Sequence, residues 1–408
     1  MPFVITITVS YCFHLITYMY TTLLTCTSWT VLFYCMQPCA DLWIYLRENR
    51  HHLKQKFVTD GNHIQEKELM AYLMQLIREY YLIYWNFPKL RSVHSRVPAY
   101  MMWDDHEIMD GWGSVDRQER IVKLKKKTQL REVQDDALLE RIVELTFQAA
   151  SAVYNEYQHS HNPGRPYRPG TDDPRTFAWD FAWSRGECYF FALDMRGGHN
   201  CEAKSDRLLG KAQHDRLQQW LDGLQAAGAK SAFVVAPVPV VHWSTITEHA
   251  QLFIPSLKDD LMDGWGHPTN HVERAKLLKA LFATSDRLKI PITIVSGDVH
   301  CASCYTLKDT KNYPGARIVQ VTSSSISRKP CGSVATMAYA PNGRMQERLD
   351  DGRGRVVKTS IYQKQVFAKA GVNNFVVISA KGSTIGITFY WPAKDGKGTE
   401  SAKVDLAK

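Results

Sequence analysis

The sequence predicts an α/β fold in which mixed β-sheets carry helices on their outside. Three observations support this prediction. Hydrophobic residues make up 45% and charged residues 22% of the 408 residues, as in a globular chain with a large buried core. Short apolar runs alternate with helical patterns through the middle of the chain, and paired strand patterns flank this region. The same composition excludes a wholly disordered chain, a collagen and a coiled coil.

The first half of the chain is expected to hold two long helical regions and a hairpin. Residues 62–86 and 117–158 carry apolar side chains three and four positions apart, which favours helices. Residues 97–102 form a short apolar run that is typical of a strand. Residues 176–183 and 187–193 predict a β-hairpin around a Ser-Arg-Gly turn.

The second half repeats the alternation of strands and helices. Helical spacing recurs at residues 211–226 and 271–287. Short apolar runs rich in β-branched residues predict the strands between and after these helices, including a second hairpin: residues 231–236, 292–295, 316–322, 374–379 and 384–390.

The chain is basic, with a formal net charge of +9 and a pI of about 9.0. A positive surface attracts phosphorylated substrates, nucleic acids or anionic membranes, although solubility explains the charge equally well. The run Lys123–Lys127 lies in a helical pattern and favours a solvated face. Because no nucleic-acid motif accompanies the charge, we expect no specific nucleic-acid partner.

Residues 1–39 differ from the rest. Residues 2–39 contain no Lys, Arg, Asp or Glu, yet eight threonines lie between Thr6 and Thr30. Three interpretations are open: a membrane anchor over residues 2–36, a buried apolar segment, or an atypical start joined to a domain over residues 40–408. We favour the third. The segment has no basic n-region and no A-x-A cleavage signal, so it fits a secretory signal poorly and predicts no location.

Nine cysteines are too few and too scattered for a disulfide framework. Cys301 and Cys304 have C-x-x-C spacing, but no second pair completes a zinc site. We therefore expect neither a metal nor a redox role for this pair.

Four predicted strands run directly into polar clusters. In open α/β sheets, ligands bind beyond the carboxyl ends of the strands, so clusters at four such ends are expected to converge on one site. The clusters are Trp103-Asp-Asp-His-Glu107, Asp194-Met-Arg196, Pro237-Val-Pro-Val-Val-His242 and Ser296-Gly-Asp-Val-His300.

The clusters offer donors for a metal ion. Asp104, Asp105, His106, Asp298 and His300 supply three carboxylates and two imidazoles, a donor set that suits Mn, Fe, Zn or Ca. In an extended chain, residues 298 and 300 point the same way, so both are expected to reach one metal. The alternatives are a helix N-terminus for the first cluster and a simple turn for the second.

Arg196 and three histidines are weaker candidates. Arg196 is a candidate clamp for a phosphate, because guanidinium binds oxyanions in a bidentate fork; a salt bridge to Asp194 or another acid is equally compatible. His242 is a candidate metal ligand or supporting residue, with a hydrogen-bonded buried histidine as the alternative. His267 and His271 are candidate substrate-loop residues.

Three blocks, in this order and spacing, resemble the PhoD-like (alkaline phosphatase D) family of the calcineurin-like metallophosphoesterases. They are Trp103-Asp-Asp-His-Glu-Ile-Met-Asp-Gly-Trp-Gly113, Leu193-Asp-Met-Arg196 and Ser296-Gly-Asp-Val-His300, within a resemblance over roughly residues 40–390. The resemblance implies a four-layer α/β/β/α sandwich with two mixed sheets and outer helices. It also implies two metal ions at the strand ends, most often iron and calcium, with Mn or Zn as other divalent or trivalent choices.

The resemblance also implies residue roles. His106 matches the histidine that protonates the leaving group or stabilises the transition state, and Arg196 is a looser match to a catalytic residue. Asp104 and Glu107 would support the metal ligands from behind. Three residues match metal-binding positions of that family: Asp105, Asp298 and His300.

The sequence departs from the family near its start. The family carries an early metal-binding block and then a Gly-Asp-x-x-Tyr block, whose Asp bridges the two metals. Ala40-Asp-Leu-Trp43 is similar to the residues that follow that block, but residues 34–39 contain no Gly-Asp. We therefore expect the first 39 residues to replace the segment that carries the bridging Asp, with consequences for metal occupancy and stability.

Two functional hypotheses result. The first is metal-dependent hydrolysis of a phosphorylated small molecule or a phosphodiester, in which two cations bind the phosphoryl oxygens and a hydroxide, and His106 protonates the leaving group. The second is a non-catalytic or impaired fragment of the same fold that binds metal or a phosphorylated ligand weakly. The G-x-S-x-G, H-E-x-x-H and phosphate-loop motifs of other enzyme classes are absent from the sequence.

Overall fold

The structure is a computed structural model, and it describes most of the chain from residue 63 onward together with short parts before it. The described residues are 3–9, 30–35, 51, 58–59, 63–86, 88–128, 135–203, 205–244, 247, 262, 264–323, 330–348, 355–395 and 398–406.

The larger of two mixed sheets has eight strands in the order β12-β13-β10-β11-β9-β8-β7-β6. Its centre is parallel, from β7 through β8 and β9 to β11, and both flanks are antiparallel. The strands are β6 (Phe181–Arg185), β7 (Cys188–Ala192), β8 (Ser231–Ala236), β9 (Pro291–Ser296), β10 (Ala302–Asp309), β11 (Tyr313–Thr322), β12 (Gly343–Arg348) and β13 (Val356–Lys369).

The smaller mixed sheet has six strands in the order β16-β15-β14-β1-β2-β5. β1 runs parallel to β2 and antiparallel to β14, and β2 runs parallel to β5. The strands are β1 (Phe3–Val9), β2 (Thr30–Cys35), β5 (Ala99–Met101), β14 (Phe375–Lys381), β15 (Thr384–Pro392) and β16 (Thr399–Val404).

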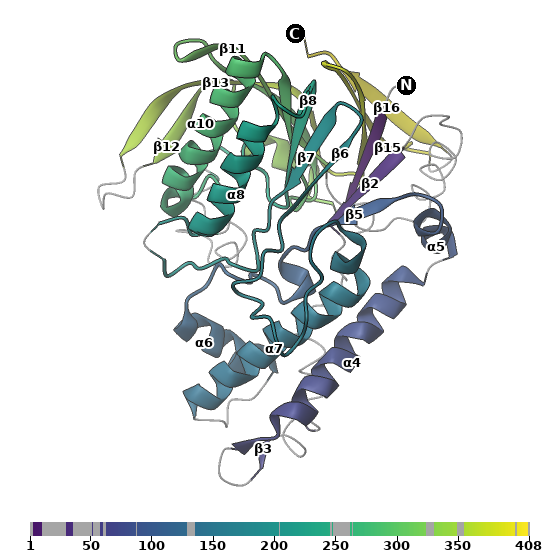
Figure 1. Ribbon diagram of the computed structural model, residues 1–408, viewed down its shortest axis with the longest axis vertical. Coiled ribbons are helices and arrows are strands. Elements are labelled where there is room, and N and C mark those ends of the chain that lie inside the picture. Colours follow the sequence, from purple (N-terminus) through teal and green to yellow (C-terminus); the bar gives the residue numbers. More distant parts are fainter. Residues whose placement is uncertain are drawn as a thin grey trace.

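Helices lie outside the sheets (Figure 1). α8 and α10 cover the outer face of the larger sheet, and α4, α6 and α7 lie together below the strands in that view. The helices are α4 (Glu66–Trp85), α5 (Pro88–His94), α6 (Arg117–Thr128), α7 (Asp136–Tyr157), α8 (Gly210–Gly223) and α10 (His271–Leu288). Short 3-10 helices (Asp105–Glu107, His159–His161, Pro268–Asn270 and Ser333–Ala338) and the small pair β3 (Val58–Thr59) and β4 (His63–Ile64) complete the described elements.

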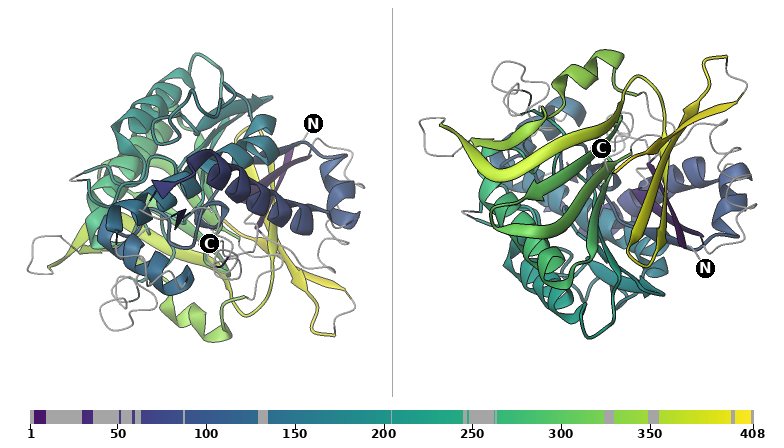
Figure 2. Two further views of the ribbon diagram at one scale, coloured as in Figure 1. Left: turned by 90° about the horizontal axis from the view of Figure 1, so that it is seen from below. Right: turned by 90° about the horizontal axis from the view of Figure 1, so that it is seen from above.

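The strand β8 shows how the layers are held together, because side chains of a strand alternate between its two faces. Ala232, Val234 and Ala236 pack with Leu221 of α8 and Leu281 of α10. Phe233 and Val235 face the other way, into a core shared with Phe389 and Ile378 of the smaller sheet. The two sheets therefore face each other across one core, and two further views show this arrangement (Figure 2). The predicted α/β fold with two mixed sheets and outer helices is confirmed.

Residues 3–9 and 30–35 occupy interior positions of the smaller sheet, as β1 and β2. Within the described part of the chain, every helix is too short or too polar to cross a bilayer. Residues 10–29 and 36–50 lie outside the described residues, and with them Cys12, Cys26, Cys39 and the Ala40–Trp43 segment.

Most predicted elements are present with shifted bounds, and several strands were missed. The helical region predicted at 117–158 contains two helices, with Asp135 capping the second through hydrogen bonds from the Ala137 and Leu138 N–H groups. The sequence analysis missed the strands β10, β12, β13 and β16. β13 alternates exposed polar and partly buried side chains, which is a weak strand pattern.

Candidate active site

The loops that follow β7, β8 and β9 share one edge of the larger sheet, because these strands are parallel neighbours. Leu193 N–H donates to Val235 O across the ends of β7 and β8, at 2.8 Å. β5 belongs to the other sheet, yet the residues after it contact the loop after β7: Trp103 Nε1 donates to Asp194 Oδ1 at 2.7 Å. The predicted convergence of strand ends is thus seen directly for the clusters after β5 and β7.

The first cluster forms a 3-10 helix over Asp105–Glu107, with Asp104 as its N-cap residue. The Asp104 N–H group donates to Glu107 Oε2 at 2.9 Å, and Gln158 Nε2 donates to Glu107 Oε1 at 3.0 Å. Burial raises the pKa of Glu107 well above its usual value, more than the Gln158 amide lowers it. The first cluster therefore does form a helix N-terminus, and Glu107 holds the turn through the Asp104 N–H group.

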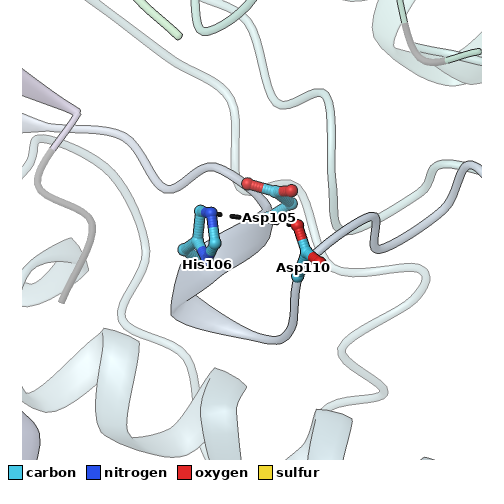
Figure 3. Close-up of side chains that lie close together, drawn as sticks. All are labelled: Asp105, His106 and Asp110. Atoms are coloured by element: carbon cyan, nitrogen blue, oxygen red, sulfur yellow. Dashed lines mark ion pairs between the residues drawn. The ribbon is translucent and has the colours of Figure 1, made fainter. Parts of the chain in front are cut away.

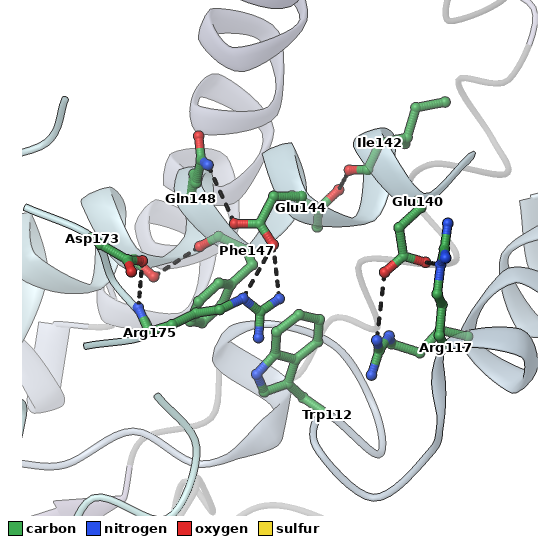
Figure 4. A network of polar contacts seen from close by, with 12 residues as sticks. Trp112, Arg117, Glu140, Ile142, Glu144, Phe147, Gln148, Asp173 and Arg175 are labelled. Carbon is green, nitrogen blue, oxygen red and sulfur yellow. Dashed lines mark hydrogen bonds and ion pairs between the residues drawn. The ribbon is translucent and has the colours of Figure 1, made fainter. Parts of the chain in front are cut away.

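Two tryptophans fix this segment on α7. Trp103 is fully buried and stacks on Tyr154, with ring centroids 4.4 Å apart, and Trp112 stacks on Phe147 at 4.7 Å. Figure 4 shows Arg175 lying against Trp112 and Phe147 while its guanidinium binds Glu144 of α7 at 2.7 Å. The turn with Asp105 and His106 is therefore held at both ends on a rigid helix.

Three metal-type donors meet on this turn (Figure 3). Donor atoms of Asp105, His106 and Asp110 all lie within 4.8 Å of one another, and His106 Nε2 is 4.0 Å from Asp110 Oδ1. Asp105 is buried, whereas the side chains of His106 and Asp110 are 16% and 30% exposed. Asp105 therefore forms the buried end of this group, and His106 and Asp110 form the end that faces solvent. Asp110 belongs to the block Trp103–Gly113, but its position beside Asp105 and His106 was missed.

Asp105 has the properties of a metal ligand. Its Oδ2 accepts a hydrogen bond from Gly111 N–H at 2.8 Å, while its buried Oδ1 has no hydrogen-bond partner among the described residues. Burial raises its pKa, but His106, Arg196 and the Gly111 N–H group together lower it below the usual value. Asp105 is thus an ionised and buried carboxylate with a hydrogen bond to only one of its two oxygens. Together with the imidazole of His106 and the carboxylate of Asp110, it fits a bound cation.

Arg196 does not present its guanidinium to a ligand. Its side chain is 1% exposed and forms an ion pair with the fully buried Asp104, with Nε donating to Asp104 Oδ1 at 2.5 Å. Its Nη1 also donates to Trp112 O at 3.2 Å. The alternative of a salt bridge to Asp194 or another acid is thus present, with Asp104 as the partner, and the phosphate clamp stays a prediction. Arg196 instead joins the loops after β5 and β7.

The loop after β7 is built around Asp194. Asp194 Oδ1 accepts hydrogen bonds from the Arg196 and Gly197 N–H groups at 3.0 and 2.9 Å, a local turn typical of Asp. Gln213 of α8 holds the Asp194 backbone at both its N–H and its carbonyl group. A Cβ on Gly197 would lie 2.4 Å from Trp179 Cδ1, so only glycine fits at this position.

Replacing Arg196 with methionine is expected to destabilise the protein by about 3–5 kcal/mol, because Asp104 would stay buried without its counter-ion. Denaturant unfolding measures this change. Arg141→Met is the matched control, since Arg141 pairs with Glu66 on the surface and its loss is expected to cost at most about 1 kcal/mol. Equal losses for the two variants would contradict the assigned role of Arg196.

The loop after β9 carries Asp298 and His300 in an unexpected backbone conformation. β9 ends at Ser296, and both residues have left-handed backbones, with φ of 68° and 54°. The extended chain that was expected to align them is therefore absent. Such strained residues cost about 1–3 kcal/mol each and gather at functional sites. Hydrogen bonds of about 3 Å hold the loop: Gly297 N–H to Pro237 O, and Cys331 N–H to His300 O.

The remaining histidines are hydrogen-bonded within the protein. His242 is buried, with Nδ1 2.8 Å from Ser303 Oγ and Nε2 3.3 Å from Cys301 Sγ, and burial lowers its pKa to about 3. His242 thus has the contacts of a hydrogen-bonded buried histidine, and its role as a ligand stays a prediction. His267 and His271 are also buried: His267 lies in the turn before α10, with its Nδ1 2.7 Å from Thr269 Oγ1, and His271 is the first residue of α10.

The structure thus joins the predicted residues in two groups at one sheet edge. One group links Asp104, Asp105, His106, Glu107 and Arg196, and the other links the loop of Asp298 and His300 to His242 through Cys301. Of the described residues, two sets of three donors lie within 4.8 Å of one another, and neither includes Asp298 or His300; the second set is Asp206, His214 and Glu273. Sequence reasoning also missed Gln158 and Gln213, which have no distinguishing local pattern.

Comparisons with known proteins place the chain in a family and show proteins of similar fold. The family model of the PhoD-like phosphatases matches residues 43–365. A solved structure of PhoD superposes with a TM-score of 0.60 at 13% identity, covering 98% of this chain and 68% of PhoD. The purple acid phosphatase PPD1 from yellow lupin seeds gives a TM-score of 0.45 at 11% identity, covering 99% of this chain and 53% of that one. The curated protein sequences gave no match. Because the family model covers most of its 408 residues, this chain belongs to the PhoD-like phosphatase family.

Proposed function

We propose that this protein is a metal-dependent phosphoester hydrolase of the alkaline phosphatase or phosphodiesterase type, and that its site lies where the loops after β5 and β9 meet the sheet edge. Membership of the PhoD-like phosphatases supports the reaction class. The observation that carries the proposal is the buried Asp105 Oδ1, which has no hydrogen-bond partner among the described residues and lies beside His106 and Asp110.

The metal ligands in this proposal are Asp105, Asp298 and His300, with Asp110 as a further donor near Asp105. Two bound cations would supply charge neutralisation of the phosphoryl group and a nucleophilic hydroxide at neutral pH. Iron and calcium are the proposed ions, and Mn or Zn are the alternatives that the carboxylate and imidazole donors accept.

The other residues of the proposed site hold the ligand turn in place or supply a proton to the leaving group. His106 is partly exposed beside Asp105 and donates a proton to the leaving oxygen or stabilises its charge. Asp104 and Arg196 neutralise each other behind the ligand turn, which keeps the Asp105 carboxylate in place. Glu107 fixes the same turn through the Asp104 N–H group.

Hydrolysis of bis-p-nitrophenyl phosphate and p-nitrophenyl phosphate tests this proposal, before and after metal removal with a chelator and after metal is added back. We expect hydrolysis that is lost with the metal and restored by it. Hydrolysis that survives complete metal removal would refute the proposal. Metal binding without any hydrolysis would instead favour an impaired fragment of the same fold.

A further inference from the structure

Two cysteine thiols meet beside the loop that follows β9. Cys301 Sγ and Cys331 Sγ donate to the same acceptor, Val299 O, at 3.1 and 3.2 Å. The backbones are joined as well, because Cys331 N–H donates to His300 O at 2.9 Å. Two segments 30 residues apart in the sequence therefore place their sulfur atoms side by side.

We propose that Cys301 and Cys331 form a site of reversible oxidation, at which a peroxide joins the two thiols in a disulfide. Both sulfurs lie within 3.2 Å of the Val299 carbonyl oxygen, which places them near each other, and a disulfide requires two sulfurs that are close in space. The partner differs from the one that the C-x-x-C spacing suggested. Cys304 is fully buried in the core between the sheets and is separated from this contact.

The exposure of the two thiols sets the order of the chemistry. Cys331 is half-buried and Cys301 is fully buried, so the oxidant reaches Cys331 first. Hydrogen peroxide converts the Cys331 thiol to a sulfenic acid and releases one water. The Cys301 sulfur then bonds to the Cys331 sulfur, and the sulfenic oxygen leaves as a second water with the Cys301 proton. Peroxide takes up the two electrons, and a dithiol reductant reverses the change.

A disulfide between Cys301 and Cys331 would restrain the loop that carries the proposed ligands Asp298 and His300. The disulfide closes a loop from Cys301 to Cys331 and ties the strained residues Asp298 and His300 to the segment at 330–331. Closing a loop of this length stabilises a protein against unfolding. We therefore expect a higher thermal midpoint for the oxidised protein, which dithiothreitol returns to the starting value.

Peptide mapping after brief peroxide treatment of the folded protein tests the proposal. Trypsin cleaves after Lys289 and Lys308, which releases Cys301 and Cys304 in one peptide. It also cleaves after Arg328 and Arg344, which releases Cys331 alone. We expect the two peptides to be linked in the oxidised sample and separate after dithiothreitol. A bond inside the 290–308 peptide, or Cys331 that stays open to alkylation, would overturn the proposal.

Two variants complete the test. Cys304→Ala is expected to keep the link between the peptides, because Cys304 takes no part in it. Cys331→Ser is expected to lose both the link and the thermal shift, while circular dichroism shows an unchanged fold. A link that disappears in Cys304→Ala would contradict the assignment. Since these readouts need neither metal nor phosphoester hydrolysis, they stand or fall independently of the proposed function.

Discussion

Replacing Asp105 with alanine is expected to remove bound metal and to abolish measurable phosphoester hydrolysis. The Oδ1 atom of Asp105 is buried and has no hydrogen-bond partner among the described residues, and in the proposed site a cation would compensate its charge. Changing a group that only supports a metal ligand costs about 10–100-fold in metal affinity, and loss of a ligand itself is expected to exceed this. Elemental mass spectrometry of the purified variant measures the metal content.

Asp116→Ala is the matched control for this variant. Asp116 is exposed in the same stretch of chain and accepts a hydrogen bond from Glu119 N–H at the start of α6. Its loss is expected to cost about 1 kcal/mol of stability and to leave the metal content unchanged. An Asp105→Ala protein that is folded, holds wild-type metal and hydrolyses phosphoesters would contradict the ligand role. The same measurement on Asp298→Ala and His300→Ala tests whether the loop after β9 belongs to the site.

Replacing His106 with alanine is expected to lower the rate while the metal stays bound, because the proposal gives this imidazole a proton to transfer and no metal to hold. The loss is expected to be greatest for substrates with poor leaving groups, at about 10²–10⁴-fold, since these need protonation most. Comparing an alkyl phosphoester with its p-nitrophenyl counterpart measures the difference, because the p-nitrophenolate leaves without help.

His161→Ala is the control for this experiment, since His161 is exposed and carries no proposed role. It is expected to leave both substrates unaffected. Equal rate losses on good and poor leaving groups would argue against proton donation by His106. Loss of metal along with rate would instead make His106 a ligand, together with Asp105 and Asp110, whose donor atoms lie within 4.8 Å of it.

The position of the candidate site at a sheet edge could be predicted from the sequence, because each strand and the polar cluster after it are neighbours in the chain. The central strands β8 and β9 are buried along their whole length and mostly apolar, as expected for parallel strands covered on both faces, and each runs directly into its polar cluster. The convergence of the clusters after β5 and β7 was predictable for the same reason. The hydrogen bond from Trp103 to Asp194 joins residues 91 positions apart, but both lie at strand ends.

The details of the site could not be predicted, because they depend on contacts between distant residues. Asp104 and Arg196 each looked available for a ligand, and only the fold shows that they neutralise each other in a buried pair. An extended chain was assumed for residues 298–300, whereas hydrogen bonds from other loops hold two of them in left-handed conformations. Cys331 contacts Val299 across 32 positions and Gln158 contacts Glu107 across 51, and such separations leave no sequence pattern.

The strands β1 and β2 show a related difficulty. A run without charged residues is compatible with a membrane anchor, with a buried segment, or with an atypical start joined to the domain over residues 40–408. Composition alone does not distinguish these three interpretations. The sheet order gives residues 3–9 and 30–35 a position between β14 and β5. The segment around Ala40 lies outside the described residues, so the expectation that the first 39 residues replace the segment with the bridging Asp stays a prediction.

Metal stoichiometry, measured together with hydrolysis on the purified wild-type protein, tests the central claim most directly. A chelated sample is titrated with iron and calcium, and then with Mn or Zn, while elemental mass spectrometry and bis-p-nitrophenyl phosphate hydrolysis are followed in parallel. The account predicts about two ions per chain at full activity, with hydrolysis rising as the ions bind. A folded protein that binds no metal, or that hydrolyses the ester at the same rate without it, would contradict the account.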